Sequence, residues 1–396
     1  MRVLIPMLAL FVSVLAEAQL MEPEGPLQRD EVRLQEFLFE ITLWQLPESG
    51  ADAPLHLPLV VDGPWSLVDP ASLSIEVWSG TTLAERRTAE EFKKPDAVGE
   101  LDVRVTMPSE GGWPMLVRLQ GQAATYSSQF NETIADRIPW PVSWPSATGR
   151  FLKPQTLIES NDPAIMAAVE ATVGTEPRDW GSPLAVAKRL IQASCAKWNT
   201  DGSHLLYGPN RTVRGLNVHG AVAGFNAGGG STSDLVCLSV AVLRAAGIPA
   251  RPVIALGAQD SEQKDALTVS GEFFLPEAGW IPFDPDVLRR RGVGSRELGQ
   301  VWRGLGDCPH LDDLVPLFWT FGPDGGRDAY EAWAGWSWAR MAPQAPFPLL
   351  VTTGEFRLGD KVLVTGQARL HSALNVRTSS KGRPKEPIIS PWRATP

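Results

Sequence analysis

Alternating apolar and polar residues characterise the first third of the chain. Four segments between residues 37 and 119 alternate with period two, and turns containing Gly or Pro separate them. The segments are 37–44, 73–78, 101–106 and 115–119. No strongly helical stretch lies between them, so the pattern predicts antiparallel strands that form a β-sandwich.

Helical spacing replaces this alternation after a linker rich in Pro and Trp, residues 139–154. Asp162 followed by Pro163 is a typical N-cap and first helical residue, and Gly174 predicts the helix end. Ser182 before a proline repeats the start signal. The apolar residues that then share one helix face are Leu184, Ala187, Ile191, Cys195 and Trp198. The cysteine in this series is therefore predicted to be a small core residue.

A third helix follows a glycine-rich segment, residues 228–230. Residues 235–246 are apolar on nearly every side, which predicts a buried central helix. Gly247 ends this helix, and Pro249 prevents its continuation. Strands are then expected at residues 251–256, 271–275 and 280–283.

The C-terminal region is rich in tryptophan. Five tryptophans stand between residues 285 and 346: Trp302, Trp319, Trp333, Trp336 and Trp338. On a strand, Trp336 and Trp338 would share a face and could stack on a sugar ring, but packing in the core is the simpler interpretation. Residues 349–374 predict two or three further strands, and the polar, Pro-rich tail after residue 378 is expected to be disordered.

The first residues resemble an export signal. Arg2 precedes an apolar run over residues 3–15, and Ala16-Glu17-Ala18 has the small-x-small pattern of a cleavage site. The run is too short to span a bilayer core of about 30 Å. We therefore expect a signal peptide cleaved after Ala18, no later transmembrane segment, and a secreted or periplasmic mature protein.

Composition narrows the partner classes. The chain has 36 basic and 45 acidic residues and a formal net charge of -9, which argues against nucleic acid as the main partner. Its three cysteines, Cys195, Cys237 and Cys308, are too few for a disulfide-based scaffold, and the sequence leaves their pairing open. No metal-binding spacing occurs, since His310 near Cys308 lacks a second ligand pair nearby in sequence. No cofactor is predicted.

Three segments carry a resemblance to a known family. Residues 234–251 form a buried-helix pattern that runs into Gly-Ile-Pro-Ala-Arg, and residues 279–285 read Gly-Trp-Ile-Pro-Phe-Asp-Pro. Together with the lead-in at residues 151–163, they resemble the transglutaminase-like superfamily. The resemblance covers roughly residues 151–286 and implies an α+β, papain-like core in which a buried helix packs on an antiparallel sheet.

In that family a Cys at the start of the helix attacks a glutamine or peptide carbonyl, a His activates it, and an Asp orients the His. The family's Cys lies 15 residues before the Gly of Gly-Ile-Pro-Ala-Arg, and here 247 − 15 = 232 is Thr232. The family's His lies 16 residues before its Asp, and here 284 − 16 = 268 is Thr268. Of the family's three catalytic residues, the resemblance thus leaves only Asp284. Without a histidine to orient, Asp284 is better interpreted as a turn-forming Asp before Pro. Cys237 lies too far inside the helix to replace the nucleophile.

Two threonines cannot supply the family's chemistry. A threonine hydroxyl is hardly ionised at neutral pH, and loss of a triad nucleophile or base costs about 10⁴ to 10⁶ in turnover. The first hypothesis is therefore a non-catalytic transglutaminase-like protein that binds an extracytoplasmic peptide, protein or glycan. The candidate groove residues are Ser231, Ser233, Asp234 and His219.

Two alternatives stay open. One is an atypical acyltransferase or peptidase with Thr232, Ser231 or Ser233 as nucleophile, supported by His219 or Asp284. The other is a glycan-binding surface on the Trp-rich segment. The predicted organisation is a signal peptide at 1–18, a β-sandwich domain at 19–138, the transglutaminase-like core at 139–286, a Trp-rich and β extension at 287–378, and a tail at 379–396.

Overall fold

A computed structural model defines the fold. It describes residues 25–43, 54–88, 95–96, 99–106, 115–202, 204–207, 213–256, 267–312, 314–321, 330–333, 336–339, 357–358, 361–362 and 364–371. The predicted signal peptide and tail lie outside these residues. Within them, no helix is long and apolar enough to cross a membrane.

Strands dominate the part of the chain before residue 131. They are β1 (Leu27–Leu43), β2 (Pro54–Val60), β3 (Ser66–Val68), β4 (Ser74–Ser79), β5 (Thr82–Thr88), β6 (Glu100–Thr106) and β7 (Met115–Phe130), with a 3-10 turn η1 (Pro70–Ser72). β1 and β7 pair antiparallel along almost their whole length. The four strands predicted from alternation correspond to β1, β4, β6 and β7. β2, β3 and β5 were not predicted: β2 contains two prolines, β3 has only three residues, and the apolar residues of β5 do not alternate.

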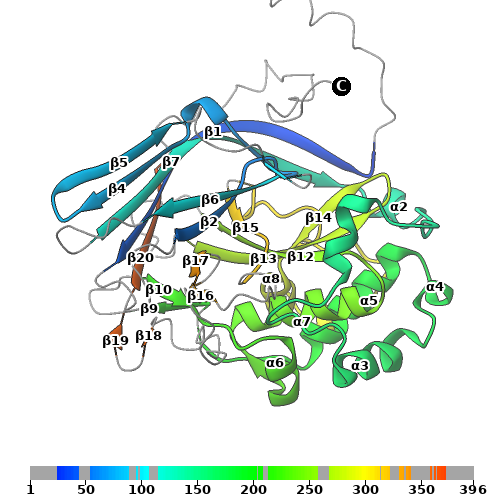
Figure 1. The fold of residues 1–396 in the computed structure, drawn as a ribbon. Coiled ribbons are helices and arrows are strands. Elements are labelled where there is room, and N and C mark those ends of the chain that lie inside the picture. The colour runs from blue at the N-terminus through cyan, green and yellow to red at the C-terminus, as the bar shows by residue number, and fades with distance from the viewer. Residues whose placement is uncertain are drawn as a thin grey trace, which may run out of the picture.

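The strands described at the far end of the chain are β16 (Tyr330–Trp333), β17 (Trp336–Ala339), β18 (Arg357–Leu358), β19 (Lys361–Val362) and β20 (Val364–His371). Of these, β16, β17 and β20 complete the sheets built on β1–β7, while β18 and β19 pair, among the described strands, only with each other. One sheet has the order β20-β1-β7-β4-β5, with β3 on β7, and another has the order β16-β17-β2-β6. Figure 1 shows β20 beside β1 although the two are far apart in sequence. Trp336 and Trp338 do lie on one strand, β17, but the exposure of their side chains lies outside what the structure describes.

The middle of the chain is a helical layer on a third sheet. The helices are α2 (Glu132–Ala135), η3 (Ser146–Leu152), α3 (Pro163–Val173), α4 (Pro177–Trp180), α5 (Pro183–Ala196), α6 (Ala221–Ala227), α7 (Thr232–Ala245), α8 (Pro285–Arg290) and η5 (Val293–Ser295). The strands are β8 (Asn199–Thr200), β9 (Leu205–Tyr207), β10 (Val213–Leu216), β11 (Gly229–Gly230), β12 (Ala250–Leu256), β13 (Leu267–Leu275), β14 (Gly279–Phe283) and β15 (Val315–Phe318). The central sheet has the antiparallel order β14-β13-β12-β15, and it lies between the N-terminal sheets and the helices in Figure 1.

The predicted helix boundaries agree with the structure. Asp162 and Ser182 cap α3 and α5 through their side chains, and Gly174 ends α3 with φ 81°. Gly247, with φ 80°, follows the end of α7. These positive φ values suit glycine, which has no Cβ to clash.

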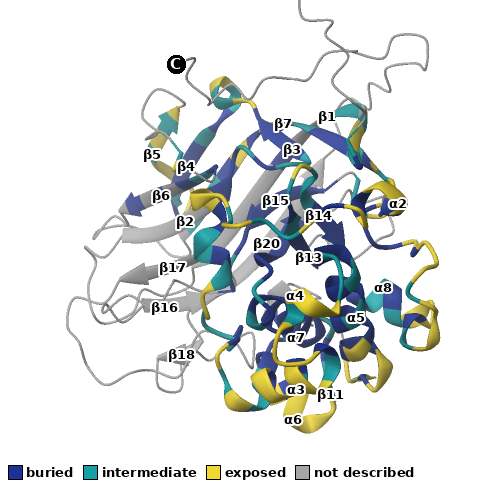
Figure 2. Ribbon diagram, turned by 90° about the vertical axis from the view of Figure 1, so that its right-hand side faces the viewer, coloured by how far each residue is buried: buried dark blue, intermediate teal, exposed yellow. Residues whose placement is uncertain are grey.

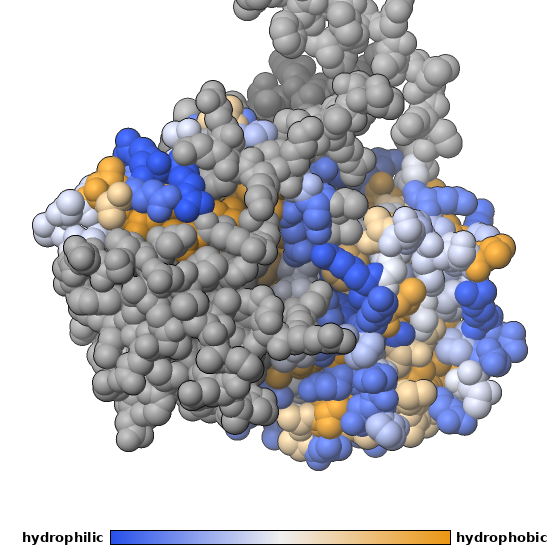
Figure 3. Space-filling model, in the orientation of Figure 1, coloured by the Kyte–Doolittle hydropathy of each residue, from blue (hydrophilic) through white to orange (hydrophobic). Residues whose placement is uncertain are grey.

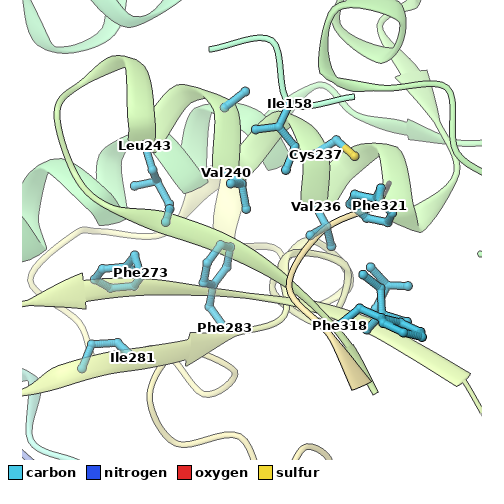
Figure 4. Packing of buried hydrophobic residues seen from close by; sticks show 14 of the residues in the cluster. Ile158, Val236, Cys237, Val240, Leu243, Phe273, Ile281, Phe283, Phe318 and Phe321 are labelled. Atoms are coloured by element: carbon cyan, nitrogen blue, oxygen red, sulfur yellow. The ribbon is translucent and has the colours of Figure 1, made fainter. Parts of the chain in front are cut away.

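α7 forms the centre of the core. Its residues from Ser233 to Arg244 are all buried, and Figure 4 shows Val236, Val240 and Leu243 facing Phe273 and Phe283 on the sheet. Figure 2 shows buried residues gathered along β13 and β14, with exposed residues on α3, α4 and α6. Hydrophilic and apolar residues are interspersed on the helical surface visible in Figure 3.

Candidate functional site

The N-terminus of α7 is built by a capping box. The Ser231 hydroxyl accepts the Asp234 backbone N–H at 3.1 Å, and the Asp234 carboxylate accepts the Ser231 backbone N–H at 2.9 Å. Ser231 Oγ also contacts the Asn217 carbonyl. Thr232 is the first helical residue and is half-buried. The Ser231 hydroxyl is thus engaged in the cap, and Thr232 is the more accessible hydroxyl at the helix start.

Asp234 joins this helix to the loop that precedes α6. Its carboxylate is fully buried and accepts backbone N–H groups of His219 at 2.5 Å and Gly220 at 3.0 Å, besides that of Ser231. A buried carboxylate needs several donors to offset its lost hydration. Asp234 therefore holds the start of α7 and residues 219–220 together.

His219 is placed at the same helix start. Its Nδ1 lies 3.2 Å from Asp234 Oδ2, and its side chain is 45% exposed. A carboxylate at one ring nitrogen leaves the other nitrogen, Nε2, for a ligand or a proton. The structure therefore places the candidate groove residue His219 at the start of α7, in contact with Asp234.

The glycine-rich segment lets the chain pass close to its neighbours. β11 pairs parallel with β8, and a Cβ on Gly229 would lie 2.1 Å from the Asn199 carbonyl oxygen. A Cβ on Gly230 would lie 2.7 Å from Asp234 Oδ2. The glycines therefore serve a close backbone approach beneath the helix start, as expected where only glycine fits.

Not every polar atom near the helix start is satisfied. Ser233 Oγ, Trp198 Nε1 and Thr200 Oγ1 are buried and have no hydrogen-bond partner among the described residues. Trp198 lies against Gly224, which in turn lies against Asp234. Ser233 itself is fully buried, so a molecule in a groove at this end would meet Thr232 and His219 before Ser233 or Asp234.

The other two candidate positions lie on the central sheet and directly after it. A tight turn at residues 246–249 reverses the chain, so β12 runs back along α7; both are about 21–23 Å long. Thr268 pairs with Ala255 near the far end of β12, and Asp284 directly follows β14. Thr268 is half-buried, and its Oγ1 lies 3.5 Å from the Ala255 carbonyl oxygen.

Asp284 has two roles. Its Oδ1 accepts the Asp286 and Val287 backbone N–H groups at 2.9 and 3.0 Å and so caps α8. Its Oδ2 lies 2.9 Å from His310 Nε2, and the His310 side chain is 38% exposed. The cap agrees with the turn-forming interpretation. The expectation that no histidine partners Asp284 is wrong, because His310 comes from a loop 26 residues downstream, outside the family's strand.

All three cysteines are free and buried. Burial raises the pKa of the Cys195 thiol to about 12 and raises the pKa values of the Cys237 and Cys308 thiols well above their ordinary value. Thiolates are the reactive form of cysteine. The chain therefore presents no accessible, activated thiol, and Figure 4 shows Cys237 within the apolar core.

The described residues contain no group of three or more His, Cys, Asp or Glu side chains that could hold a metal ion. His219 with Asp234, and His310 with Asp284, are pairs rather than ligand sets. The arrangement at the helix start is therefore one of hydroxyls, a carboxylate-bound imidazole and backbone donors.

Comparison with protein families identifies part of this architecture. Residues 181–285 match the model of the transglutaminase-like superfamily. The chain contains a transglutaminase-like domain. The matched residues include α5, α7 and the first three strands of the central sheet, and the domain has the papain-like arrangement of a buried helix on an antiparallel sheet.

Solved structures are similar to the chain at low identity. A protein of Cytophaga hutchinsonii, provisionally described as a cysteine protease, is 13% identical, with a TM-score of 0.44 over 87% of this chain and 100% of its own. The periplasmic domain of TgpA from Pseudomonas aeruginosa is 15% identical, with a TM-score of 0.31 over 66% of this chain and 91% of its own. No curated protein matches the chain.

Sequence reasoning missed His310 as a partner of Asp284. The sequence singles out His310 only as a possible metal ligand beside Cys308, because nothing local links residue 310 to residue 284. The link exists because Asp284 N donates to the Gly304 carbonyl and Gly306 N donates to the Pro282 carbonyl, which hold the returning chain against β14. No local pattern in the sequence marks this pair.

Proposed function

We propose that this chain is a non-catalytic transglutaminase-like protein that acts outside the cytoplasm by binding a peptide, a protein or a glycan. The observation that carries the proposal is that a threonine, not a cysteine, begins α7. Thr232 stands at the helix start, while all three cysteines are buried elsewhere and their thiols have raised pKa values. Cysteine acyl chemistry needs an accessible thiolate at this place. We assign Thr232 and Thr268 to the positions of the family's Cys and His.

A second candidate function rests on His219. A histidine hydrogen-bonded to a buried carboxylate is the base-orienting pair of triad enzymes, and here it lies at the helix start that also carries Thr232. This geometry favours, as the alternative, an acyltransferase or peptidase with Thr232 as nucleophile and His219 as base. Ser231 and Ser233 are weaker candidates because one is engaged in the cap and the other is fully buried.

One assay separates the two candidates. Acyl transfer and peptide hydrolysis are measured for the purified protein, for Thr232→Ala and for His219→Ala. We expect all three to be equally inactive. Turnover by the unchanged protein that is lost in both variants would overturn the non-catalytic proposal and identify a threonine–histidine pair.

A gain-of-function variant tests the assignment of the two threonines. Thr232→Cys combined with Thr268→His puts the family's nucleophile and base at the two assigned positions, with Asp284 at the third. We expect thiol-dependent hydrolysis from the double variant and none from either single variant. Inactivity of a folded double variant would mean that residues 232 and 268 are not the family's catalytic positions.

Export and the N-terminal architecture complete the proposal. The apolar segment at residues 3–15 and the Ala16-Glu17-Ala18 sequence support cleavage after Ala18 and a secreted or periplasmic location. The antiparallel sheets built on β1–β7 support a β-sandwich beside the transglutaminase-like domain. N-terminal sequencing of the exported protein would begin at Gln19 if the leader assignment is right.

A further inference from the structure

A cleft lies on the face of the central sheet that points away from α7. Ile254 and Phe273 belong to the cluster that includes α7, whereas the neighbouring Arg251 and Glu272 point to the opposite face and bond to each other. The cleft has a volume of about 360 Å³, within the range of small-molecule sites. Its walls come from the loop between β2 and β3, from η3, from β14 and from the end of β15.

A buried guanidinium forms part of the wall. Arg251 is 1% exposed, and its Cζ lies 3.5 Å from the ring centroid of Trp319 and 3.8 Å from that of Trp280. Its Nε donates to Glu272 Oε2 at 2.7 Å, but its Nη2 has no hydrogen-bond partner among the described residues. Burial lowers the pKa of this guanidinium to about 10, so it remains charged at neutral pH. Glu272 and the two indole rings therefore fix the guanidinium in place, and its Nη2 remains without an acceptor among the described residues.

Two indoles in the same wall also lack acceptors. Trp65 Nε1 and Trp319 Nε1 are buried without a hydrogen-bond partner among the residues that the structure describes. Buried donors in proteins are nearly always paired. Asp62, the carboxylate in the wall, already has an interaction. Three of the residues that line the cleft therefore carry unpaired N–H donors that are closed to solvent, and a ligand that reached them would have to bring acceptor oxygens.

We propose that this cleft binds a carboxylate, either of a small organic acid or of a peptide C-terminus. A carboxylate provides two acceptor oxygens, one of which can accept from the unpaired Nη2 of Arg251 and the other from an indole N–H. Because the three nitrogens are closed to bulk solvent in the ligand-free cleft, binding includes a small adjustment of the loop that carries Trp65. The formal charges of Arg29 and Arg251 cancel those of Asp62 and Glu272. The preference for a carboxylate therefore comes from the unpaired N–H donors and not from a net positive charge. The proposal goes beyond the function assigned to the α7 face and does not depend on it.

Nuclear magnetic resonance of the indole N–H groups tests this directly. The full chain, labelled at tryptophan, is titrated with N-acetylglycine, with a short peptide acid, and with the same peptide as its C-terminal amide. We expect the resonances of Trp65 and Trp319 to shift with an acid, and the amide to bind at least about tenfold more weakly, because a hydrogen bond to a charged group is the stronger one. Trp65→Phe assigns its resonance and should weaken binding of the acid about fivefold to tenfold.

The exposed Trp180 on α4 provides the matched control. Trp180→Phe should leave binding unchanged. Binding of only the free acid, or of only the peptide acid, would each support the proposal and identify the source of the carboxylate. Unshifted indole resonances with both acids, or equal binding of acid and amide, would overturn the proposal. Buried water would then be the partner of the three unpaired nitrogens. A rise in melting temperature with acid but not amide gives a second readout that needs no variant.

Discussion

The buried Asp234 clamp makes the sharpest prediction about stability. Asp234→Ala removes the acceptor of three backbone N–H groups, those of His219, Gly220 and Ser231, at 2.5, 3.0 and 2.9 Å. A hydrogen bond to a charged group contributes about 1.5 to 3 kcal/mol. Water can reach the half-exposed loop and compensate in part, so we expect a loss of about 3 to 5 kcal/mol, the range for breaking a buried charged network.

The assay is equilibrium denaturation by urea, with hydrogen exchange of the three amides as a local readout. Asp286→Ala is the matched control, since Asp286 also lies in the first turn of a helix but pairs with the partly exposed Arg289 and Arg290. Such surface pairs contribute about 0 to 1 kcal/mol. If the two variants were destabilised equally, or if exchange at residues 219, 220 and 231 did not accelerate in Asp234→Ala, the clamp would not hold the helix start.

Two further predictions concern the core. Arg251→Met should destabilise the protein by about 3 to 5 kcal/mol, because it leaves Glu272 buried without its partner, and adding Glu272→Leu should recover part of that loss. The denaturation midpoints of the single and double variants test this prediction. A double variant no more stable than the single one would contradict it. Alkylation of Cys195 at pH 8 should be negligible, since a pKa of about 12 leaves a thiolate fraction of about 10⁻⁴. As long as the fold holds, its labelling should rise about tenfold for each pH unit, and mass spectrometry that found rapid labelling at pH 8 would refute the buried thiol.

Local chemistry explains why much of the helical core was predictable. Asp162 and Ser182 cap their helices with their own side chains, and Gly174 and Gly247 adopt positive φ where the helices end. Each of these signals acts within about four residues, so the sequence alone shows it. Continuous apolar composition likewise predicted that α7 would be buried, because every face of it contacts another element.

Long-range pairing could not be read in the same way. β20 pairs with β1, and β17 pairs with β2, across most of the chain. No local pattern selects a strand's partner, because alternation fixes only which face a residue occupies. The same limit hid the pair of His310 and Asp284.

Caps, helix breakers and periodicity are properties of neighbouring residues, so the sequence alone predicts the elements of the transglutaminase-like domain, the burial of its central helix and the residues at the helix start. Which polar groups meet depends on how distant segments fold against each other. The tertiary structure joined His219 to Asp234, gave Asp284 a histidine, and placed Arg251 between two indoles with one arm of its guanidinium unpaired. Hydrogen bonds depend on distances of about 3 Å, and the folding of distant segments against each other sets those distances.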